Sequence, residues 1–404
     1  MKRIFKTAAT TALITAASLS HASLSDDKVK IGVLGDMGGV YSDITGQGSI
    51  EAVQMAVDDF GGKVLGKPIE VVSADTQLKP DIGSTIARQW IENEQVDVIS
   101  GAVASSVTGA VTKIMSDAKK ITLIAAPASH AFTTSGCSPY NAHWSYDVVS
   151  LANGTVQPMV AGGAKKWFFV TADYGFGHAL ESVATGVIEA NGGEVVGGVR
   201  APLGTSDFSS YILQAQSSGA DVIALANTGS DMVNALKTAA EFGLTEMADV
   251  AGLLVFTPNA QALDPEIAGG MKLTTGFYWD MDEQTREWSK RYMARMDGKL
   301  PSMAQAGAYS SVMHYLNAVE AVGTDDSDAV MAKMKETPVE DFFSRNGYLR
   351  IDGRMVHDML QVRIKNADER SDANDIFTIE KVIKGEDAFL KLEDGGCEFA
   401  LNQK

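Results

Sequence analysis

Short apolar runs alternate with amphipathic stretches along most of the chain, and this alternation limits the folds that it can adopt. The apolar runs are rich in Val and Ile, which indicates buried strands. The stretches between them carry apolar residues at helical spacing, as in 49–60, where Val53, Ala56 and Val57 share one face. A repeated strand–helix order is typical of α/β folds, in which helices cover both faces of a parallel sheet.

The strand–helix order falls into two blocks separated by an irregular segment, 128–146, and it gives way to a mainly helical pattern after residue 277. The expected strands are 29–34, 69–72, 96–99, 121–124, 167–170, 194–199, 222–225, 250–256, 359–364 and 377–382. The expected helices are 49–60, 82–91, 106–118, 179–190, 209–217, 232–242, 283–296, 305–321 and 328–335.

The length of 404 residues exceeds what one hydrophobic core usually takes, so we expect two lobes. Each block would form a doubly wound parallel sheet, and the last part of the chain does not follow the order of the second block. We therefore expect a hinge that the chain crosses more than once, which suits opening and closing. The expected division is 23–145 with 275–355 in lobe 1, and 146–274 with 356–404 in lobe 2.

The N-terminus has the pattern of an export signal. A basic start with Lys2, Arg3 and Lys6 precedes the apolar run 7–19, and the small-x-small end at Ala22 fits a cleavage site. We expect residues 1–22 to be a signal peptide cleaved near Ala22, which would place the protein in the periplasm; an ordinary buried N-terminal helix is the alternative. The apolar run is too short to span a bilayer.

The charge of the chain argues against a nucleic-acid partner. The formal net charge is −17 at pH 7, and the predicted signal peptide contributes only bases. Such an acidic surface repels phosphate backbones.

The sequence contains no recognisable catalytic or metal-binding motif. A Gly-x-Ser-x-Gly elbow, a Walker loop and a His-Glu-x-x-His helix are all missing from it. The pair Gly175 and Gly177 lacks the third glycine and the later acid of a dinucleotide site, so we interpret it as a tight turn. The six histidines are scattered, without metal-ligand spacing. These observations predict a protein without catalytic residues, metal or cofactor, although an enzyme on the same fold stays an alternative.

Polar and aromatic residues follow several predicted strands. In open α/β sheets, ligands lie beyond the carboxyl ends of the strands. The segments 100–106, 125–130 and 171–175 occupy such positions, and Ser105 or Ser106 fits the N-cap of a helix. Helix capping explains these residue types equally well. A helix start there would also favour an anionic or carbonyl group of a ligand.

Several segments in order resemble the branched-chain-amino-acid-type periplasmic substrate-binding proteins of ABC importers. They are Lys30-Ile31-Gly32-Val33-Leu34, Gly38-Gly39-Val40-Tyr41, the helix 51–59, the Ser105 turn, Asp173-Tyr174-Gly175-Phe176-Gly177 and the segment 205–210. A closer similarity, to the subgroup that binds aromatic acids, rests on the segments 137–147, 151–155, 276–281 and 395–397. The resemblance covers nearly the whole chain after residue 22 and implies a type I periplasmic binding fold.

The sequence alone allows two interpretations of the two cysteines: they form a disulfide, or they are two unrelated buried thiols. The resemblance to the aromatic-acid subgroup implies that Cys137 and Cys397 are bonded.

The resemblance also implies a set of ligand contacts and a function. The implied contact residues are Tyr41, Ser105, Ala128, His130, Tyr174, Asn227, Thr228, Phe256 and Tyr278. Amino-acid binders of this family pair an acid with the ligand's ammonium, but the matching segment here, 253–256, is apolar. A buried ammonium without a counter-charge is costly, so a carboxylate with an aromatic body is favoured. Phe256, Tyr278 and Trp279 would supply stacking surface, or simply pack in a core.

The expected partners are this small carboxylate and an ABC permease in the inner membrane, with the protein acting as a monomer. The alternatives are a binder of an amino acid or small amide, and a sensory module for a membrane receptor.

Overall fold

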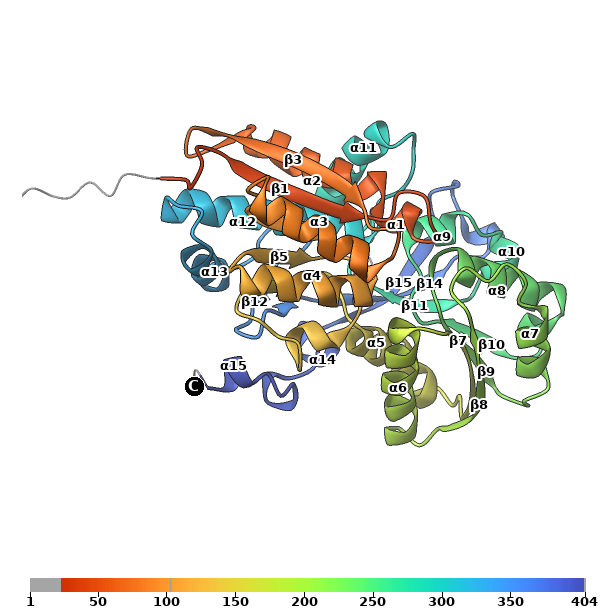
Figure 1. The fold of residues 1–404 in the computed structure, drawn as a ribbon. Helices are drawn as coiled ribbons and strands as arrows, with labels where there is room; N and C mark the ends of the chain where they lie inside the picture. Colours follow the sequence, from red (N-terminus) through yellow and green to blue (C-terminus); the bar gives the residue numbers. More distant parts are fainter. Residues whose placement is uncertain (1–22, 102–103, 403–404) are drawn as a thin grey trace, which may run out of the picture.

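Two α/β lobes lie beside each other in the computed structural model, which describes residues 23–101 and 104–402 (Figure 1). The signal peptide expected over 1–22 lies outside the described residues. Within the described ranges, no helix has the length and apolar character needed to cross a membrane.

The first lobe is built on a six-stranded sheet in the order β2-β3-β1-β4-β5-β6. Its strands are β1 (Val29–Gly35), β2 (Lys63–Val64), β3 (Lys67–Asp75), β4 (Val98–Gly101), β5 (Ile121–Ile124) and β6 (Asn141–His143). All neighbours are parallel except β2, which forms an antiparallel hairpin with β3. In the register of the central strands, Ile31 lies between Val71 and Val98.

The second lobe is built on a seven-stranded sheet in the order β15-β14-β11-β10-β9-β7-β8. Its strands are β7 (Lys166–Ala172), β8 (Glu194–Ala201), β9 (Val222–Ala226), β10 (Asp249–Gly252), β11 (Lys272–Thr275), β14 (Met359–Ile364) and β15 (Phe377–Ile383). The strands from β8 to β11 are parallel, whereas β14 and β15 are antiparallel additions at one edge. The sheet is therefore mixed, and not purely parallel as expected. The two antiparallel strands belong to the last part of the chain, which enters β14 on its return from the first lobe.

Helices cover the faces of both sheets. The helices of the first half are α1 (Ser42–Thr45), α2 (Gln47–Phe60), α3 (Pro80–Glu92), α4 (Ser105–Asp117), α5 (Val148–Ala161), α6 (Gly175–Ala190) and α7 (Ser209–Gln216). Those of the second half are α8 (Gly229–Glu241), α9 (Thr257–Gln261), α10 (Pro265–Ala268), α11 (Glu283–Arg295), α12 (Met303–Val322), α13 (Ser327–Glu336), α14 (Gly385–Ala388) and α15 (Glu398–Leu401). A small hairpin, β12 (Tyr348–Leu349) with β13 (Met355–Val356), and four single turns of 3-10 helix complete the chain.

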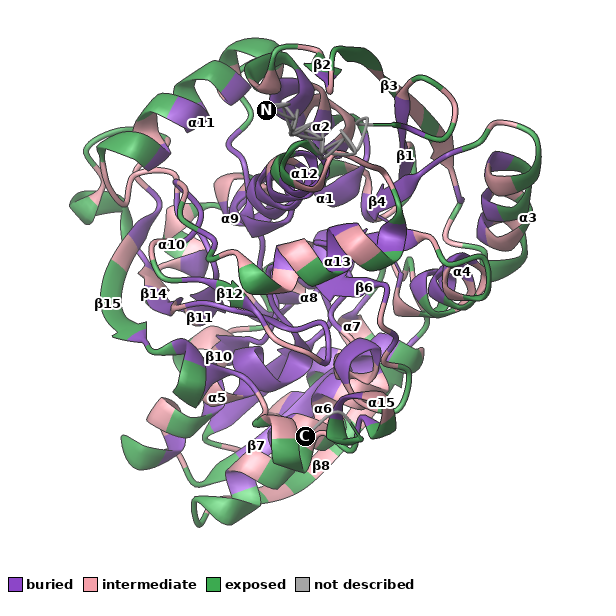
Figure 2. Cartoon of the chain, turned by 90° about the vertical axis from the view of Figure 1, so that its left-hand side faces the viewer, coloured by how far each residue is buried: buried purple, intermediate pink, exposed green. Residues whose placement is uncertain are grey.

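The chain passes between the two sheets several times. It leaves the first lobe after β6, builds the second sheet up to β11, and returns with α12, which packs against α2 and is buried along most of its length (Figure 2). It crosses again to form β14. Arg354, just before this last crossing, is 1 % exposed and donates a hydrogen bond of 3.2 Å to the carbonyl of Tyr146 on the first crossing.

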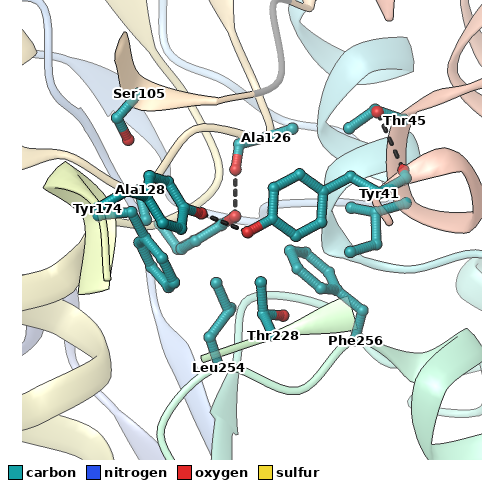
Figure 3. Close-up of a pocket in the computed structure, with 12 residues that line it drawn as sticks. Tyr41, Thr45, Ser105, Ala126, Ala128, Tyr174, Thr228, Leu254 and Phe256 are labelled. Carbon is teal, nitrogen blue, oxygen red and sulfur yellow. Dashed lines mark hydrogen bonds between the residues drawn. The ribbon is translucent and has the colours of Figure 1, made fainter. Parts of the chain in front are cut away.

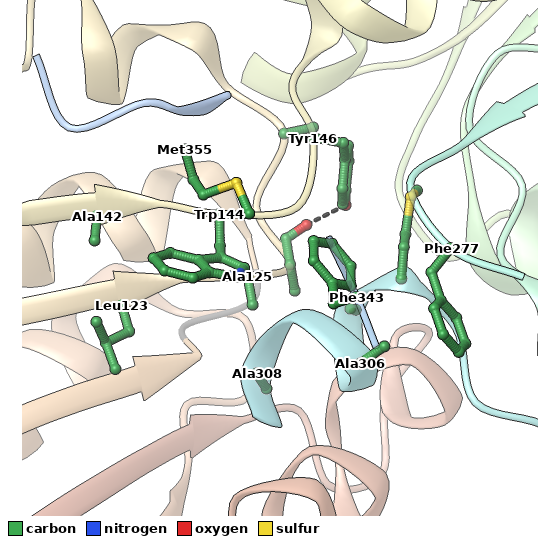
Figure 4. Close-up of a cluster of buried hydrophobic side chains, with 14 of the residues drawn as sticks. Leu123, Ala125, Ala142, Trp144, Tyr146, Phe277, Ala306, Ala308, Phe343 and Met355 are labelled. Atoms are coloured by element: carbon green, nitrogen blue, oxygen red, sulfur yellow. Dashed lines mark hydrogen bonds between the residues drawn. The ribbon is translucent and has the colours of Figure 1, made fainter. Parts of the chain in front are cut away.

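Aromatic side chains fill the core where the first sheet meets α12. Trp144 is fully buried among Leu123, Ala125 and Ala142 on one side and Ala308 of α12 on the other (Figure 4). Its indole N–H donates a 3.0 Å hydrogen bond to the hydroxyl of Ser310, so the polar edge of this large ring does not remain unpaired.

The expected strand over 250–256 is too long. Strand β10 ends at Gly252, although the N–H of Leu253 still donates to the carbonyl of Leu225 in β9 at 3.2 Å. Leu254 and Phe256 line the space between the lobes, and Val255 packs in the core of the second lobe. The apolar character of residues 253–256 reflects their burial and not a longer strand. Helix α5 and the strands β6 and β11 are additions that the sequence pattern did not indicate.

The disulfide between Cys137 and Cys397 is confirmed, with an S–S distance of 2.06 Å. It fixes the end of the chain to the first lobe, where the ammonium of Lys335 also lies 5.3 Å from the centre of the Phe399 ring. Residues 356–404, expected together in lobe 2, thus contain two strands of the second sheet and a final segment that is bonded to the first lobe.

Candidate functional site

A small cavity lies between the two lobes, beyond the carboxyl ends of strands from both sheets (Figure 3). The residues that line it are Tyr41, Ile44, Thr45, Ser105, Ala126, Ala128, Tyr146, Tyr174, Phe176, Thr228, Leu254 and Phe256. The space open to the centre of a water-sized sphere is about 30 Å³, which is room for little more than one or two waters. The lobes are therefore closed on each other in this structure.

Three helices begin at the cavity without a side chain to cap them. Ser105 is the first residue of α4, and Tyr174 and Thr228 stand just before α6 and α8. None of the three cap positions has a side-chain hydrogen bond to the helix. The first N–H groups of a helix lack partners within it, and the helix dipole adds partial positive charge at that end. The three helix starts together favour an anionic group in the cavity.

The interpretation of Ser105 or Ser106 as an N-cap is wrong. Helix α4 already includes both serines, and the residue at the cap position is Ala104, which has no side-chain oxygen. The hydroxyl of Ser105 instead lines the cavity.

Three tyrosines bring neutral hydroxyl groups to the cavity. The hydroxyls of Tyr41, from the first lobe, and Tyr174, from the second, hydrogen-bond to each other, and Tyr146 donates to the carbonyl oxygen of Ala126 (Figure 3). Burial raises the pKa of all three phenols above their ordinary value. They consequently act as neutral hydrogen-bonding groups at physiological pH.

The described side chains that line the cavity include no acid, base or cysteine. The nearest carboxylates stand behind the lining. Both oxygens of Asp36 accept backbone N–H groups, from Gly39 at 2.8 Å and Tyr41 at 2.9 Å. Asp231, 2 % exposed, accepts the N–H of Gly204 at 3.0 Å through one oxygen, and its other oxygen has no partner. This lining gives no set of metal ligands and no acid–base pair.

The structure brings six of the nine expected contact residues to this one cavity. They are Tyr41, Ser105, Ala128, Tyr174, Thr228 and Phe256. The hydroxyl of Thr228 is enclosed and has no hydrogen-bond partner, so a polar group of a ligand would satisfy it.

Three expected contact residues lie outside the lining. Tyr278 is in the core of the second lobe, where its hydroxyl accepts the N–H groups of Ile376 and Phe377, each at 3.2 Å. His130 is half-buried in a turn of 3-10 helix, and Asn227 is buried behind Thr228. The indole of Trp279, also considered for stacking, donates to the carbonyl of Asn374 at 2.9 Å.

Six lining residues were not expected from the sequence: Ile44, Thr45, Ala126, Tyr146, Phe176 and Leu254. Ala126 and Leu254 lie in strand-end segments that the sequence did indicate, two residues from the chosen Ala128 and Phe256. Ile44 and Thr45 belong to the short helix α1, for which no periodic signal exists.

Two α/β lobes joined by several crossings, with a cavity between them, define the architecture of a two-lobed binding protein. A family model described as "periplasmic binding protein" matches residues 28–370, and the chain belongs to this family. The protein is thus a periplasmic substrate-binding protein of the ABC-transporter type and not an enzyme, in agreement with the sequence-based prediction.

Solved structures of other proteins share the fold. A periplasmic binding protein from Burkholderia mallei is 46% identical, with a TM-score of 0.90 over 92% of this chain and 99% of that one. A branched chain amino acid ABC transporter periplasmic ligand-binding protein from Burkholderia xenovorans is 38% identical, with a TM-score of 0.82 over 92% and 100%. A solute binding protein from Rhodopseudomonas palustris, in complex with 3,4-dihydroxy benzoic acid, is 21% identical, with a TM-score of 0.81 over 89% and 98%.

Proposed function

We propose that this protein captures a small carboxylate with an apolar, preferably aromatic, body between its lobes. The observation that carries the proposal is the meeting of the uncapped starts of α4, α6 and α8 at a cavity whose lining has no charged side chain. Backbone N–H groups and helix dipoles would hold the carboxylate, and no basic residue is needed for this.

The remaining lining suits an apolar body. Ile44, Leu254 and Phe256 present aliphatic and aromatic surface, and Phe176 adds a second ring. Aromatic side chains prefer offset or edge-to-face contacts with another ring. An aromatic carboxylate is larger than the closed cavity of about 30 Å³. It would therefore separate Tyr41 from Tyr174 and replace the hydrogen bond between their hydroxyls with bonds to itself. The Rhodopseudomonas palustris protein binds 3,4-dihydroxy benzoic acid, so a protein with this fold can hold an aromatic carboxylate.

A branched-chain amino acid is the second candidate, because the Burkholderia xenovorans relative is named for one. Its ammonium would need a buried acid. Asp231 is the buried carboxylate with an unpartnered oxygen near the cavity, where its charge acts on Tyr41 and Tyr174. It stands behind the lining and not in it, which favours a ligand without an ammonium group.

The protein would be exported, and it would act together with a permease in the membrane. Residues 1–22 would be removed near Ala22, and the remaining chain would act as a monomer, because closure needs both lobes free to move. The closed form would deliver its ligand to an ABC permease in the inner membrane. Alternatively, the closed, ligand-bound form would bind a membrane receptor and so signal that the ligand is present.

A thermal-shift comparison of the exported protein with benzoate, benzamide, phenylalanine and leucine tests the ligand class. Bound ligand raises the melting temperature by mass action. We expect stabilisation by benzoate and little by benzamide, which has the same ring without the negative charge. Thr228→Val, which keeps the side-chain shape, should weaken the benzoate effect. Stabilisation by leucine or phenylalanine together with none by any aromatic carboxylate would refute the proposal.

A further inference from the structure

Three carboxylates from distant parts of the sequence meet at the edge of lobe 1 that faces away from the cavity. Asp26 precedes β1, Asp97 precedes β4, and Asp325 lies between α12 and α13. One oxygen atom of each lies within 4.8 Å of the others. Figure 1 shows the start of β1 beside α12 and α13, at the end of the first lobe remote from the second.

Neighbouring groups fix two of the three carboxylates. Asp97 is 2 % exposed and accepts the backbone N–H of Lys30 at 2.9 Å and the ammonium of Lys120 at 3.0 Å. Asp325 accepts both the backbone N–H and the hydroxyl of Ser25, at 2.9 and 2.6 Å. Such outer hydrogen bonds orient carboxylates that bind a cation.

Other groups at this place have no partner. Both side-chain oxygens of Asp26 are enclosed, and neither accepts a hydrogen bond from a described residue. The hydroxyl of Tyr315, on α12, is enclosed and unpartnered as well, and the side chain is 1 % exposed. The negative charges that act on this hydroxyl are those of Asp97 and Asp325, so it lies near the same group of acids. An enclosed carboxylate without any partner is costly and calls for a missing positive charge.

We infer that Asp26, Asp97 and Asp325 bind a calcium ion, with the hydroxyl of Tyr315 beside it. Lys120 is the one ammonium among the described residues that contacts the three carboxylates, and the more distant Lys28 acts on Asp26 but pairs with Glu70 at 3.1 Å. The three acids therefore keep an excess of negative charge that a divalent cation balances. Three carboxylates supplied by the protein suit calcium better than magnesium, which usually keeps several waters and binds one or two carboxylates. The ion would hold residues 23–26 against β4 and the α12–α13 connection, and waters would complete its shell.

The site is independent of the ligand cavity, and the experiment uses the exported protein without ligand. The melting temperature is measured against CaCl2, MgCl2 and NaCl of matched ionic strength, for the wild type, D26N and D27N. Asp27 is the matched control because it is exposed and pairs with Lys67 at 2.7 Å, outside the group of acids. We expect calcium to raise the melting temperature of the wild type and D27N with a midpoint of about 0.1–1 mM, as in extracellular calcium modules. D26N should lose this response.

Terbium luminescence gives a second readout that does not depend on stability. Terbium replaces calcium, and its emission on tyrosine excitation should fall several-fold in Tyr315→Phe, whereas Tyr348→Phe, an exposed tyrosine on β12, should match the wild type. Absence of a calcium response in the wild type, or an equal response in D26N, would overturn the inference. Unchanged carboxylate binding by D26N would show that the variant is folded.

Discussion

The carbonyl oxygen of Val40, in the first lobe, lies so close to Gly229, in the second, that a Cβ on this glycine would be 2.6 Å from it. Gly229 begins α8 with a φ of +65°, and the ring of Tyr41 lies against the same position. The closed form of the protein therefore has no room for a side chain here, and this contact provides a specific way to oppose closure.

Gly229→Ala should weaken ligand binding by roughly tenfold or more, because about 1.4 kcal/mol against the closed form reduces its population by that factor. Gly219→Ala is the matched control: its φ is +67°, so the backbone strain is similar, but no atom lies within 4 Å of the added Cβ. Isothermal titration of both variants checks this. Equal affinities in G219A and G229A would show that the contact does not limit closure.

Tyr174→Phe should favour the open form of the ligand-free protein. The variant loses the hydrogen bond to Tyr41 across the lobes, and a loss of about 1 kcal/mol corresponds to a roughly fivefold change in the ratio of open to closed molecules. Small-angle scattering should give a larger radius of gyration than for the wild type or for Tyr348→Phe. An unchanged radius would contradict the prediction.

Asp231→Asn distinguishes the two ligand candidates. Burial raises the pKa of Asp231. One of its carboxylate oxygens has no hydrogen-bond partner, so Asp231 is the acid that would pair with the ammonium group of an amino-acid ligand. For an aromatic carboxylate we expect unchanged or slightly tighter binding, because a nearby negative charge is removed. A loss of more than about tenfold, equal to 1.4 kcal/mol, would instead indicate an ammonium-bearing ligand. Calorimetry with Asp249→Asn, an exposed acid, as control measures both outcomes.

The stability of the protein should fall as the pH drops below about 6.5, partly because of His143. Its ring is fully buried and hydrogen-bonds to the carbonyl of Pro127 at 2.8 Å, and burial, followed by Arg354, lowers the pKa of this imidazole well below its usual value. The unfolded chain therefore takes up a proton that the folded chain refuses, which costs about 1.4 kcal/mol per pH unit below the unfolded pKa.

His143→Gln should flatten this part of the dependence, since the amide keeps a donor but does not titrate. Urea unfolding at pH 7.5, 6.5 and 5.5 measures the slope. His178→Gln, at a partly exposed position of α6 where the ring lies 2.8 Å from Asp173, serves as the control. The same slope in the wild type and in H143Q would exclude His143 as its source.

The double variant C137S/C397S should lose roughly 2–5 kcal/mol of stability, because the bond joins residues 260 positions apart and restricts the unfolded chain. Ligand affinity should stay close to that of the wild type, since the bond lies outside the cavity lining. Denaturant unfolding and calorimetry give the two values. A double variant as stable as the wild type would show that packing alone holds the final segment.

Local pattern predicted most of the helices and strands because each has one buried face or a fully buried run. Helix α5 was not predicted, since residues from Val148 to Val156 are buried on nearly every side and show no polar face. Strand β6 is short and begins with the buried polar side chain of Asn141. A pattern that depends on contrast between faces does not detect such segments.

The strand-end pattern indicated Ser105 and Tyr174, whereas Tyr41 was implied by the resemblance to the family. The resemblance also suggested Tyr278 as stacking surface for a ligand, but this residue packs in the core of the second lobe. Phe256 and Tyr278 are both buried aromatics, and residue type alone does not tell a core position from a cavity wall.

The sequence by itself determined two α/β blocks, the positions of most elements and a binding protein without a catalytic motif, because these depend on local periodicity and on motifs of fixed spacing. Only the tertiary structure decided which strand ends meet. Tyr41 and Tyr174 are 133 residues apart, and the carboxylates of Asp26, Asp97 and Asp325 come from three separate parts of the chain. The first contact forms when the two lobes close, and the second when the first lobe folds, and no local pattern in the sequence records either geometry.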